Sequence, residues 1–536
     1  MIRYPVKLQI KQPVLSLTSN CNCYIIDITH MKKGEKMYIE IDFNSDEALY
    51  MQLRNQIILG IATHQYVEGD SLPSVRQLAE EIGINMHTVN KAYGVLKQEG
   101  LIRLDRRRGA VISLDLEMCI RDRDNTAHLF PVIAGAGMSN VYRVCAVLKE
   151  DIQEDKLQQA LDKVLPKFPV FNVRLRQGVF WYYFEENGKQ SPKVVQEDSW
   201  PCQYVEAAIN QNYLFRVSYY KRKISLEVFH VLTDGNGAFV FLKELIYQYL
   251  RDTKPELAGL PDHLAADTST DYTDGFLQHY RKPSGGKTAY KKERAYHIPG
   301  RMFETGKMSL MHGFMPVSQL KEKAKAYGAS INEYLVAAFI WSIYQSKGER
   351  KIKEPVTVGV PVNLRPHFSS VTTKNFFVMV TAVWQAKQTE ADFGEVLEAV
   401  KNSLRPQLEK EHLEEVFSYN VSNEKKMILR AVPLWLKKPA MRYVYRSAAK
   451  ANTTTVSNLG VVHTPPEYDP YIEQFYSCLS RSLGQNMKGC VCSYKDTLVF
   501  TISSVYRDTE VQKAFFCFMA DEGISVRIES NGVYYE

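Results

Sequence analysis

Apolar residues recur at helical spacing in three short stretches between residues 46 and 100. The second stretch ends at Gly83, and Asn85 can cap the third, which ends at Gly100. Two short apolar strands, 101–104 and 110–112, follow around a turn rich in arginine. The order of helix, turn, helix and two-strand hairpin predicts a winged helix-turn-helix.

The pattern changes after Glu117, and from Tyr142 strands and helices alternate to the end of the chain. Residues 252–300 show little apolar periodicity and include a basic cluster, which favours a crossover between two lobes. Beyond it the spacing predicts helices at 317–327 and 331–346 and strands at 356–362 and 374–384.

These patterns divide the chain into five parts. Residues 1–36 have no clear periodicity, and we expect Met37 to be the natural initiator. The parts are 1–36, unassigned; 37–117, a winged helix; 118–125, a junction; 126–300, a first lobe with its crossover; and 301–536, a second lobe.

Composition limits the functional classes. With 536 residues the chain exceeds one typical core, and 45% hydrophobic and 24% charged residues are ordinary globular values. The net charge of +7 is small, so a case for DNA binding must rest on local charge. The nine cysteines lack zinc-ligand spacing, so we expect free thiols and no metal site. No apolar stretch spans a membrane and no signal peptide is present, so we expect a cytoplasmic protein.

The third helix begins with short polar and basic side chains, as a helix that enters the major groove of DNA must. Asparagine can read adenine, and threonine and lysine suit phosphates or base edges. The helix before it and the arginine turn would meet the DNA backbone or minor groove. The candidate DNA-binding residues are Arg76, Asn85, His87, Thr88, Asn90, Lys91, Arg106, Arg107 and Arg108.

The segment 39–113 resembles the GntR family of bacterial transcription regulators, and its Asn90–Tyr93 run is most similar to the YtrA subfamily. Three runs carry the resemblance in order: Leu72–Ala79, His87–Val89 and Leu96–Ile102. It implies binding of a double-stranded DNA operator as a homodimer. The family places an effector-binding or dimerising region after the wing, where this chain has a different module.

The segment from Lys223 to Gly237 is the richest in chemistry. Apolar residues at period two predict a strand that ends at His230, with the ring on the apolar face. A glycine-rich turn with Asp234 then leads into a helix. A histidine at such a position can act as a general base, with a carboxylate nearby to orient it. The alternative is a core histidine bonded to backbone, the more common case for a lone histidine.

The spacing His230-x-x-x-Asp234-Gly235 resembles the H-x-x-x-D-G motif of CoA-dependent acyltransferases with the chloramphenicol-acetyltransferase and condensation-domain fold. Pro361–Arg365, Asn375–Phe377 and Ser457–Gly460 resemble later elements of that superfamily. Together they are most similar to alcohol-acetyltransferase-like members across residues 126–536. The fold class expected for the whole chain is therefore α+β and multidomain: a winged helix-turn-helix followed by two chloramphenicol-acetyltransferase-like α/β lobes.

This second resemblance implies a mechanism. His230 would deprotonate an alcohol or amine acceptor, which attacks acyl-CoA, most simply acetyl-CoA, as co-substrate. Asp234 would be structural and pair with an arginine, for which Arg365 is the candidate. Ser457 or Asn458 would stabilise the oxyanion, a contribution of about 3 kcal/mol. Phe229 stands where condensation domains have a second histidine, which favours simple acyl transfer over peptide synthesis.

The junction is unusual as a linker. Met118–Arg123 has no glycine, proline or serine, and resembles a peptide translated from sequencing-adaptor DNA within an assembled contig. We therefore expect the chain to be an assembly chimera of two genes, a regulator and an enzyme. The alternative is a natural one-component regulator whose second half is a non-catalytic, ligand-sensing acyltransferase-like domain. His230 and Asp234 favour an enzyme, because a sensor needs no base.

Overall fold

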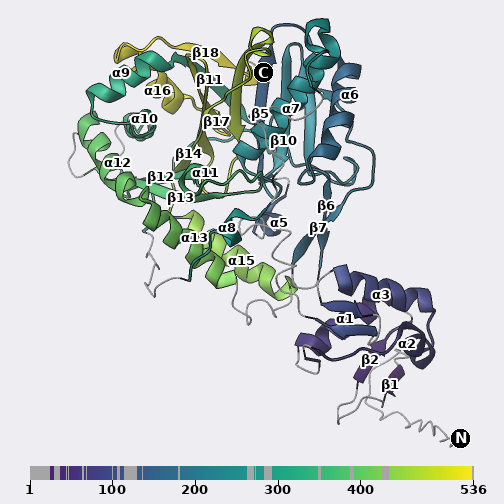
Figure 1. The fold of residues 1–536 in the computed structure, drawn as a ribbon. Coiled ribbons are helices and arrows are strands. Elements are labelled where there is room, and N and C mark those ends of the chain that lie inside the picture. Colours follow the sequence, from purple (N-terminus) through teal and green to yellow (C-terminus); the bar gives the residue numbers. More distant parts are fainter. Residues whose placement is uncertain are drawn as a thin grey trace, which may run out of the picture. The chain divides into compact units, whose positions relative to one another are not determined.

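The chain forms two separate units, Met1–Met118 and Cys119–Glu536, in a computed structural model (Figure 1). The described residues are 24–28, 37–43, 45, 48–62, 66–67, 69–98, 101–105, 109–113, 129–135, 137–178, 181–261, 271, 273–282, 293–347, 352–386, 391–424 and 434–533. The predicted junction at 118–125 lies outside the described residues, and the boundary between the two units, after Met118, falls in this stretch of the sequence.

The first unit contains the helix, turn, helix and hairpin that the pattern predicts. Its core is formed by buried side chains of all three helices and of the hairpin, among them Leu53, Leu78, Val89 and Val111. Its elements are β1 Tyr24–Ile28, β2 Met37–Ile41, α1 Leu49–Ala62, α2 Val75–Ile82, α3 Met86–Gln98, β3 Ile102–Asp105 and β4 Gly109–Ile112. Strand β1, within the range that the sequence left unassigned, pairs antiparallel with β2.

Local capping explains the sharp turn between α2 and α3. The Ser74 hydroxyl accepts a hydrogen bond from the Gln77 amide at the start of α2. Gly83 ends that helix at φ 68°, a left-handed conformation that glycine adopts without strain. The Asn85 side chain then accepts from the His87 amide at 2.8 Å, as the sequence predicts for the cap of α3.

A five-stranded sheet and two long helices form the first layer pair of the second unit. The strand order is β15-β5-β10-β9-β8, and α6 and α7 pack together beside it (Figure 1). The elements are α5 Phe130–Ile133, β5 Val141–Leu148, α6 Glu154–Val164, β6 Val173–Gln177, β7 Tyr182–Glu186, β8 Val195–Gln196, β9 Phe215–Tyr220, β10 Lys223–Phe229, α7 Gly235–Thr253 and α8 Gly275–Gln278.

A seven-stranded mixed sheet organises the rest, in the order β13-β12-β14-β16-β17-β11-β18. In chain order, the elements from residue 309 onward are β11 Ser309–Pro316, α9 Val317–Ala326, α10 Ile331–Gln345, β12 Val356–Asn363, α11 Arg365–Phe368, β13 Phe377–Trp384, α12 Phe393–Gln407, α13 Lys410–Glu424, α15 Leu434–Ala449, β14 Thr454–Val461, β15 Ile472–Leu479, β16 Met487–Tyr494, β17 Thr497–Ser504, α16 Glu510–Asp521 and β18 Arg527–Ser530. Helix α10 is buried along almost its whole length between α12 and α16.

One strand crosses between the lobes. Strand β15 comes from the late part of the chain, yet it pairs antiparallel with β5 at the edge of the first sheet. It also contacts β16 and β17 of the second sheet. The division at residue 300 did not include this exchange, which joins the two lobes into one unit.

Two further expectations concern thiols and membranes. The six cysteines within the described part of the chain are free thiols, as predicted. Among the helices of the described residues, none is long and apolar enough to cross a membrane.

Candidate functional site

The exposed end of α3 carries the side chains that the sequence assigned to DNA. His87, Asn90 and Lys91 are exposed and Thr88 is half-buried, while Val89 and Ala92 enter the core. Asn85 is exposed as well, but its side-chain oxygen already caps the helix. The helix therefore offers polar groups on one side and is anchored on the other, as a recognition helix requires.

The two cations of this surface hold partners within the unit. The Arg76 Nε lies 3.1 Å from a Glu80 carboxylate oxygen one helical turn away, and both side chains are strongly exposed. The Lys91 ammonium lies 4.0 Å from the centre of the Tyr50 ring. Exposed contacts of this kind are weak, so DNA phosphates can replace them. The predicted wing residues Arg106, Arg107 and Arg108 lie outside the described residues.

His230 is placed by the end of β10, but not on the strand itself. The strand ends at Phe229, one residue earlier than the alternation predicts, and a turn carries the histidine. Its ring packs against Phe130 and Tyr142 of the first lobe and Phe377 of the second, with ring centres 5.0, 4.8 and 5.7 Å away. His230 therefore lies between the two lobes, and it remains partly exposed.

Asn375 fixes the orientation and the tautomer of that ring. Its side-chain NH2 donates to the His230 backbone carbonyl at 3.3 Å, and its oxygen lies 3.1 Å from His230 Nδ1. Because an amide oxygen only accepts, Nδ1 must carry the proton, and Nε2 is left as the basic nitrogen. Burial lowers the pKa of His230 below its usual value of 6.5, so the neutral base predominates at neutral pH. From the sequence, Asn375 is notable only as part of a run that resembles the superfamily, with no role assigned to it. Its contact with His230 is seen in the structure alone.

Asp234 and Arg365 meet, although 131 residues separate them. Both side chains are buried, and two guanidinium nitrogens lie 2.8 and 3.1 Å from the two carboxylate oxygens. The carboxylate also accepts from the backbone amides of Gly237 and Phe376. The arginine in turn donates to the carbonyl oxygens of Thr372 and Lys374. The pair thus ties the turn after His230 to the loop of the second lobe that carries Asn375.

Glycines allow this turn to pack closely. A Cβ on Gly235 would lie 2.5 Å from a methyl group of Leu459, and one on Gly237 would overlap the Thr373 carbonyl oxygen. The H-x-x-x-D-G spacing therefore places a small residue where the two lobes touch.

The structure separates the two oxyanion candidates. Asn458 faces α10, where its NH2 donates to Asn332, while its oxygen accepts from the Gly460 amide. Ser457 is on the opposite face of β14, as is Leu459, which contacts Gly235. Ser457 is thus on the face of the strand that meets the His230 turn, and Asn458 is not.

Lys488 is a buried cation that sequence reasoning missed. It lies on β16, two residues before Cys490, the register partner of Ser457, so these side chains share a face of the sheet. Its ammonium donates to the Ser482 hydroxyl at 2.5 Å, and no carboxylate pairs with it among the described residues. Burial lowers the pKa of Lys488 to about 8, and its positive charge contributes to the lowered pKa of His230.

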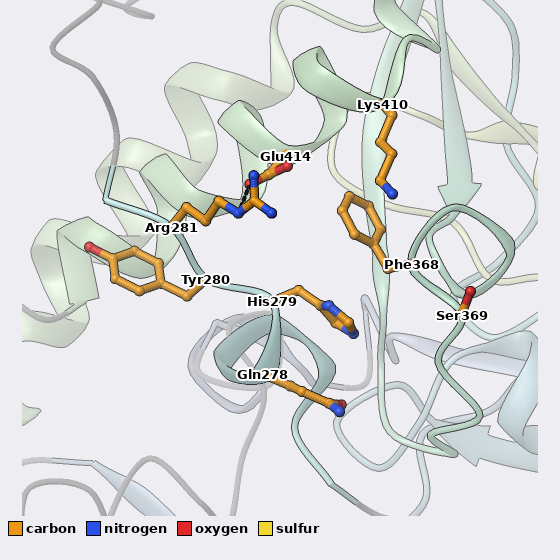
Figure 2. Close-up of a pocket in the computed structure, with 8 residues that line it drawn as sticks. All are labelled: Gln278, His279, Tyr280, Arg281, Phe368, Ser369, Lys410 and Glu414. Atoms are coloured by element: carbon orange, nitrogen blue, oxygen red, sulfur yellow. Dashed lines mark ion pairs between the residues drawn. The ribbon is translucent and has the colours of Figure 1, made fainter.

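A separate pocket of about 340 Å³ lies between α8, α13 and the loop after α11 (Figure 2). Arg281 points toward Glu414, 2.9 Å away, and Lys410 lies beside the Phe368 ring. His279 stacks on Phe376, whose backbone amide holds Asp234. The pocket is therefore a polar hollow next to the residues that hold Asp234, and the cation Arg281 is already paired with Glu414 within it.

Comparisons with known proteins support the domain type expected for the first unit and the fold expected for the second. Residues 46–112 match the family model "Bacterial regulatory proteins, gntR family". The HTH-type transcriptional repressor YtrA of Bacillus subtilis is 43% identical over 75 residues, which are 14% of this chain and 58% of that protein. The chain spans about three-fifths of the length of the curated relatives that it matches. A GntR-type helix-turn-helix domain thus occupies this part of the chain.

Two solved structures resemble the larger unit. Trichothecene 15-O-acetyltransferase TRI3 from Fusarium sporotrichioides has a TM-score of 0.50 at 10% identity, covering 75% of this chain and 95% of that one. TRI101 of F. sporotrichioides, solved with Coenzyme A and T-2, has a TM-score of 0.51 at 12% identity, covering 76% and 99%. At such identities the likeness shows the fold, which is the acyltransferase-like α/β fold expected from the sequence.

Proposed function

We propose that the chain joins a sequence-specific, DNA-binding transcription regulator to a CoA-dependent acyltransferase with His230 as its general base. The observation that carries the enzymatic half is the Asn375 contact. It places the proton on Nδ1 and leaves Nε2 as the basic nitrogen of a partly exposed ring between the lobes. A purely structural histidine would have both nitrogens occupied.

The chemistry needs one base and one polar donor. Nε2 removes the proton from an acceptor alcohol or amine, and the acceptor attacks the thioester carbonyl of acetyl-CoA. When the tetrahedral intermediate collapses, the carbon–sulfur bond breaks, and the thiolate takes the proton back from Nε2. Ser457 is the donor that we assign to the oxyanion, and the positive charge of Lys488 on the same face favours that negative charge.

Thiol release from acetyl-CoA by the full chain, across a panel of small alcohols and amines, tests this assignment. His230→Ala should lower turnover about 100-fold or more, the range for loss of a general base. His463→Ala is the matched control, since it removes an exposed histidine that contacts no residue of the site. Equal turnover in wild type and His230→Ala would remove His230 from the reaction.

The pH profile gives a second, independent reading. Because burial lowers the pKa of His230, the acid limb of the kcat/KM profile should have its midpoint below pH 6.5. An acid limb centred above pH 6.5 would identify another group as the base.

The regulatory half of the proposal rests on the exposed polar end of α3 and on the GntR-type domain. The partner would be a double-stranded operator in the cytoplasm, bound by two copies of the chain. We do not assign the second unit a sensing role, because the free Nε2 favours an enzyme. A direct test of the fusion is amplification across the codons for residues 110–130 from source DNA.

A further inference from the structure

Helix α15 carries an exposed apolar stripe. Trp435, Leu436, Tyr443 and Val444 are 70, 49, 75 and 64% exposed. With Pro439 and Ala440 they recur at i, i+1, i+4, i+5, i+8 and i+9, which places them on one face. Leu434 and Ala449 anchor the helix on its other side, where they are buried. Contiguous exposed apolar groups of this size are uncommon on a protein surface and usually mark an interaction site.

Cations border the stripe. The helix has four, Lys437, Lys438, Arg442 and Arg446, and the sequence Leu434–Ala449 contains no acidic residue. Lys437 lies 4.6 Å from the Trp181 ring centre, and Lys438 donates to Gln177 at 2.8 Å, so both stand beside the β6–β7 hairpin. A partner must therefore be apolar in the middle and negatively charged at its edges.

The helix also contacts α5, which packs against His230. Arg442 Nε donates to the Val132 carbonyl of α5 at 3.1 Å, and the Tyr445 hydroxyl lies 3.5 Å from the Met138 sulfur. Figure 1 shows α15 next to α5. Phe130, the first residue of α5, packs its ring against His230 at 5.0 Å. Helix α15 is thus connected to the candidate base through α5, which contacts both.

We propose that α15 docks on an anionic phospholipid surface, with its apolar stripe in the headgroup region and its cations on the lipid phosphates. Tryptophan and tyrosine favour this interface because their rings are apolar while their N–H and O–H groups stay hydrated. The cations favour anionic lipid, because each is attracted to the negatively charged surface. An acyl acceptor dissolved in the lipid would then reach His230 past α5. This last step rests on the proposed acyl transfer; the docking does not.

Flotation of the full chain with vesicles of phosphatidylcholine and phosphatidylglycerol tests the docking. The protein should float with these vesicles and at least tenfold less with phosphatidylcholine alone. Trp435→Ser with Tyr443→Ser should weaken binding about tenfold or more, because it removes two rings that enter the interface. Ile209→Ser with Tyr220→Ser is the matched control, since these side chains are also exposed, at 82 and 46%, on the same unit.

The outcomes separate the alternatives. Arg446→Gln should weaken binding less, and added salt should abolish that difference. His230→Ala should bind vesicles as the wild type does, so loss of activity and loss of docking are distinguishable. Docking is refuted if the α15 double variant floats as well as the control. It is also refuted if the wild type does not float. A dimer seen by sedimentation in the wild type but not in the double variant would then identify a second copy of the chain as the partner of the stripe.

Discussion

The two candidate sites hold their charged side chains in opposite ways. In the winged helix, Arg76 and Lys91 are exposed and rest on Glu80 and Tyr50. In the larger unit, Asp234 and Arg365 are buried, and each finds further backbone partners. Exposed pairs contribute about 0–1 kcal/mol and exchange partners readily. Breaking a buried pair costs about 3–5 kcal/mol, because one charge is left unpaired.

This difference fits the functions that we propose for the two sites. A surface that binds DNA phosphates must release its own contacts when the phosphates arrive, so weak contacts are an advantage. A base that takes one proton from one acceptor must stay in place, so the turn that carries it is tied down. The predictions below test this contrast, in order of decreasing effect.

The largest effect should follow from breaking the buried pair. Asp234→Asn keeps the size of the side chain but removes the charge facing Arg365. It also places an amide NH2, which is a donor, against the N–H donors of Arg365 or Gly237. It should lower the free energy of unfolding by roughly 3 kcal/mol or more, and activity should fall with it. Arg365→Ala should do the same, measured by denaturant unfolding and thiol release.

The double variant is the decisive measurement. Each single change leaves one buried charge without its partner. The double variant should therefore lose less unfolding free energy than the sum of the two single variants. Additive losses would show that the two side chains do not interact in solution, and would contradict the link between the lobes.

The sequence predicted those features of the two sites that depend only on residues close to one another along the chain. Helix boundaries, the Asn85 cap and the exposed face of α3 follow from neighbouring residues, and the structure has them. The Asp234–Arg365 pair is not local, and it was expected only because a family resemblance carried it. Asn375 belonged to the same resemblance but had no role assigned to it, and nothing in the sequence pointed to Lys488. What both residues do depends on which strands become neighbours. The crossing of β15 is likewise decided by tertiary pairing, which residue spacing does not encode.

An acid-induced loss of stability should follow from a buried histidine of the larger unit. His312 lies on β11, 2.8 Å from the Thr501 hydroxyl, and burial together with Lys223 and Arg143 lowers its pKa to about 3. The folded protein keeps this ring neutral while the unfolded chain protonates it at about 6.5. Stability is therefore intact above pH 6.5 and is lost as the pH falls from there toward 3, by up to about 1.4 kcal/mol per unit, or less than about 3 kcal/mol over the measured range from pH 6 to 4.

His312→Gln supplies the control for this loss. It retains polarity but cannot titrate, so the unfolding free energy of the variant should depend less steeply on pH between 6 and 4 (roughly the range that the two pKa values bracket). The same slope in both proteins would assign the acid lability to other groups.

A smaller effect is expected at the DNA-facing surface. Arg76→Ala should weaken DNA binding uniformly across sequences and lower the salt slope by about one, as loss of a single phosphate contact does. Its unfolding free energy should change by less than about 0.5 kcal/mol, since the side chain is exposed. Asn90→Ala should instead change sequence preference. Binding titrations at several salt concentrations measure both, and a uniform loss for Asn90→Ala would mean that Asn90 reads no base.

The smallest effect tests the contrast most directly, because it removes the partner and leaves the cation. Glu80→Gln deletes the carboxylate that holds Arg76, at a cost of about 0.3–0.5 kcal/mol for an exposed helix pair. If Arg76 binds phosphate, the freed guanidinium and the lost negative charge should tighten DNA binding a few-fold at low salt, and the gain should vanish at high salt. Glu81→Gln is the matched control, since Glu81 contacts Gln77 and not Arg76. An equal gain in both variants would reflect net charge alone. A gain confined to Glu80→Gln would show that the Arg76 contact is exchanged for phosphate, as a weak exposed pair allows and the buried Asp234–Arg365 pair does not.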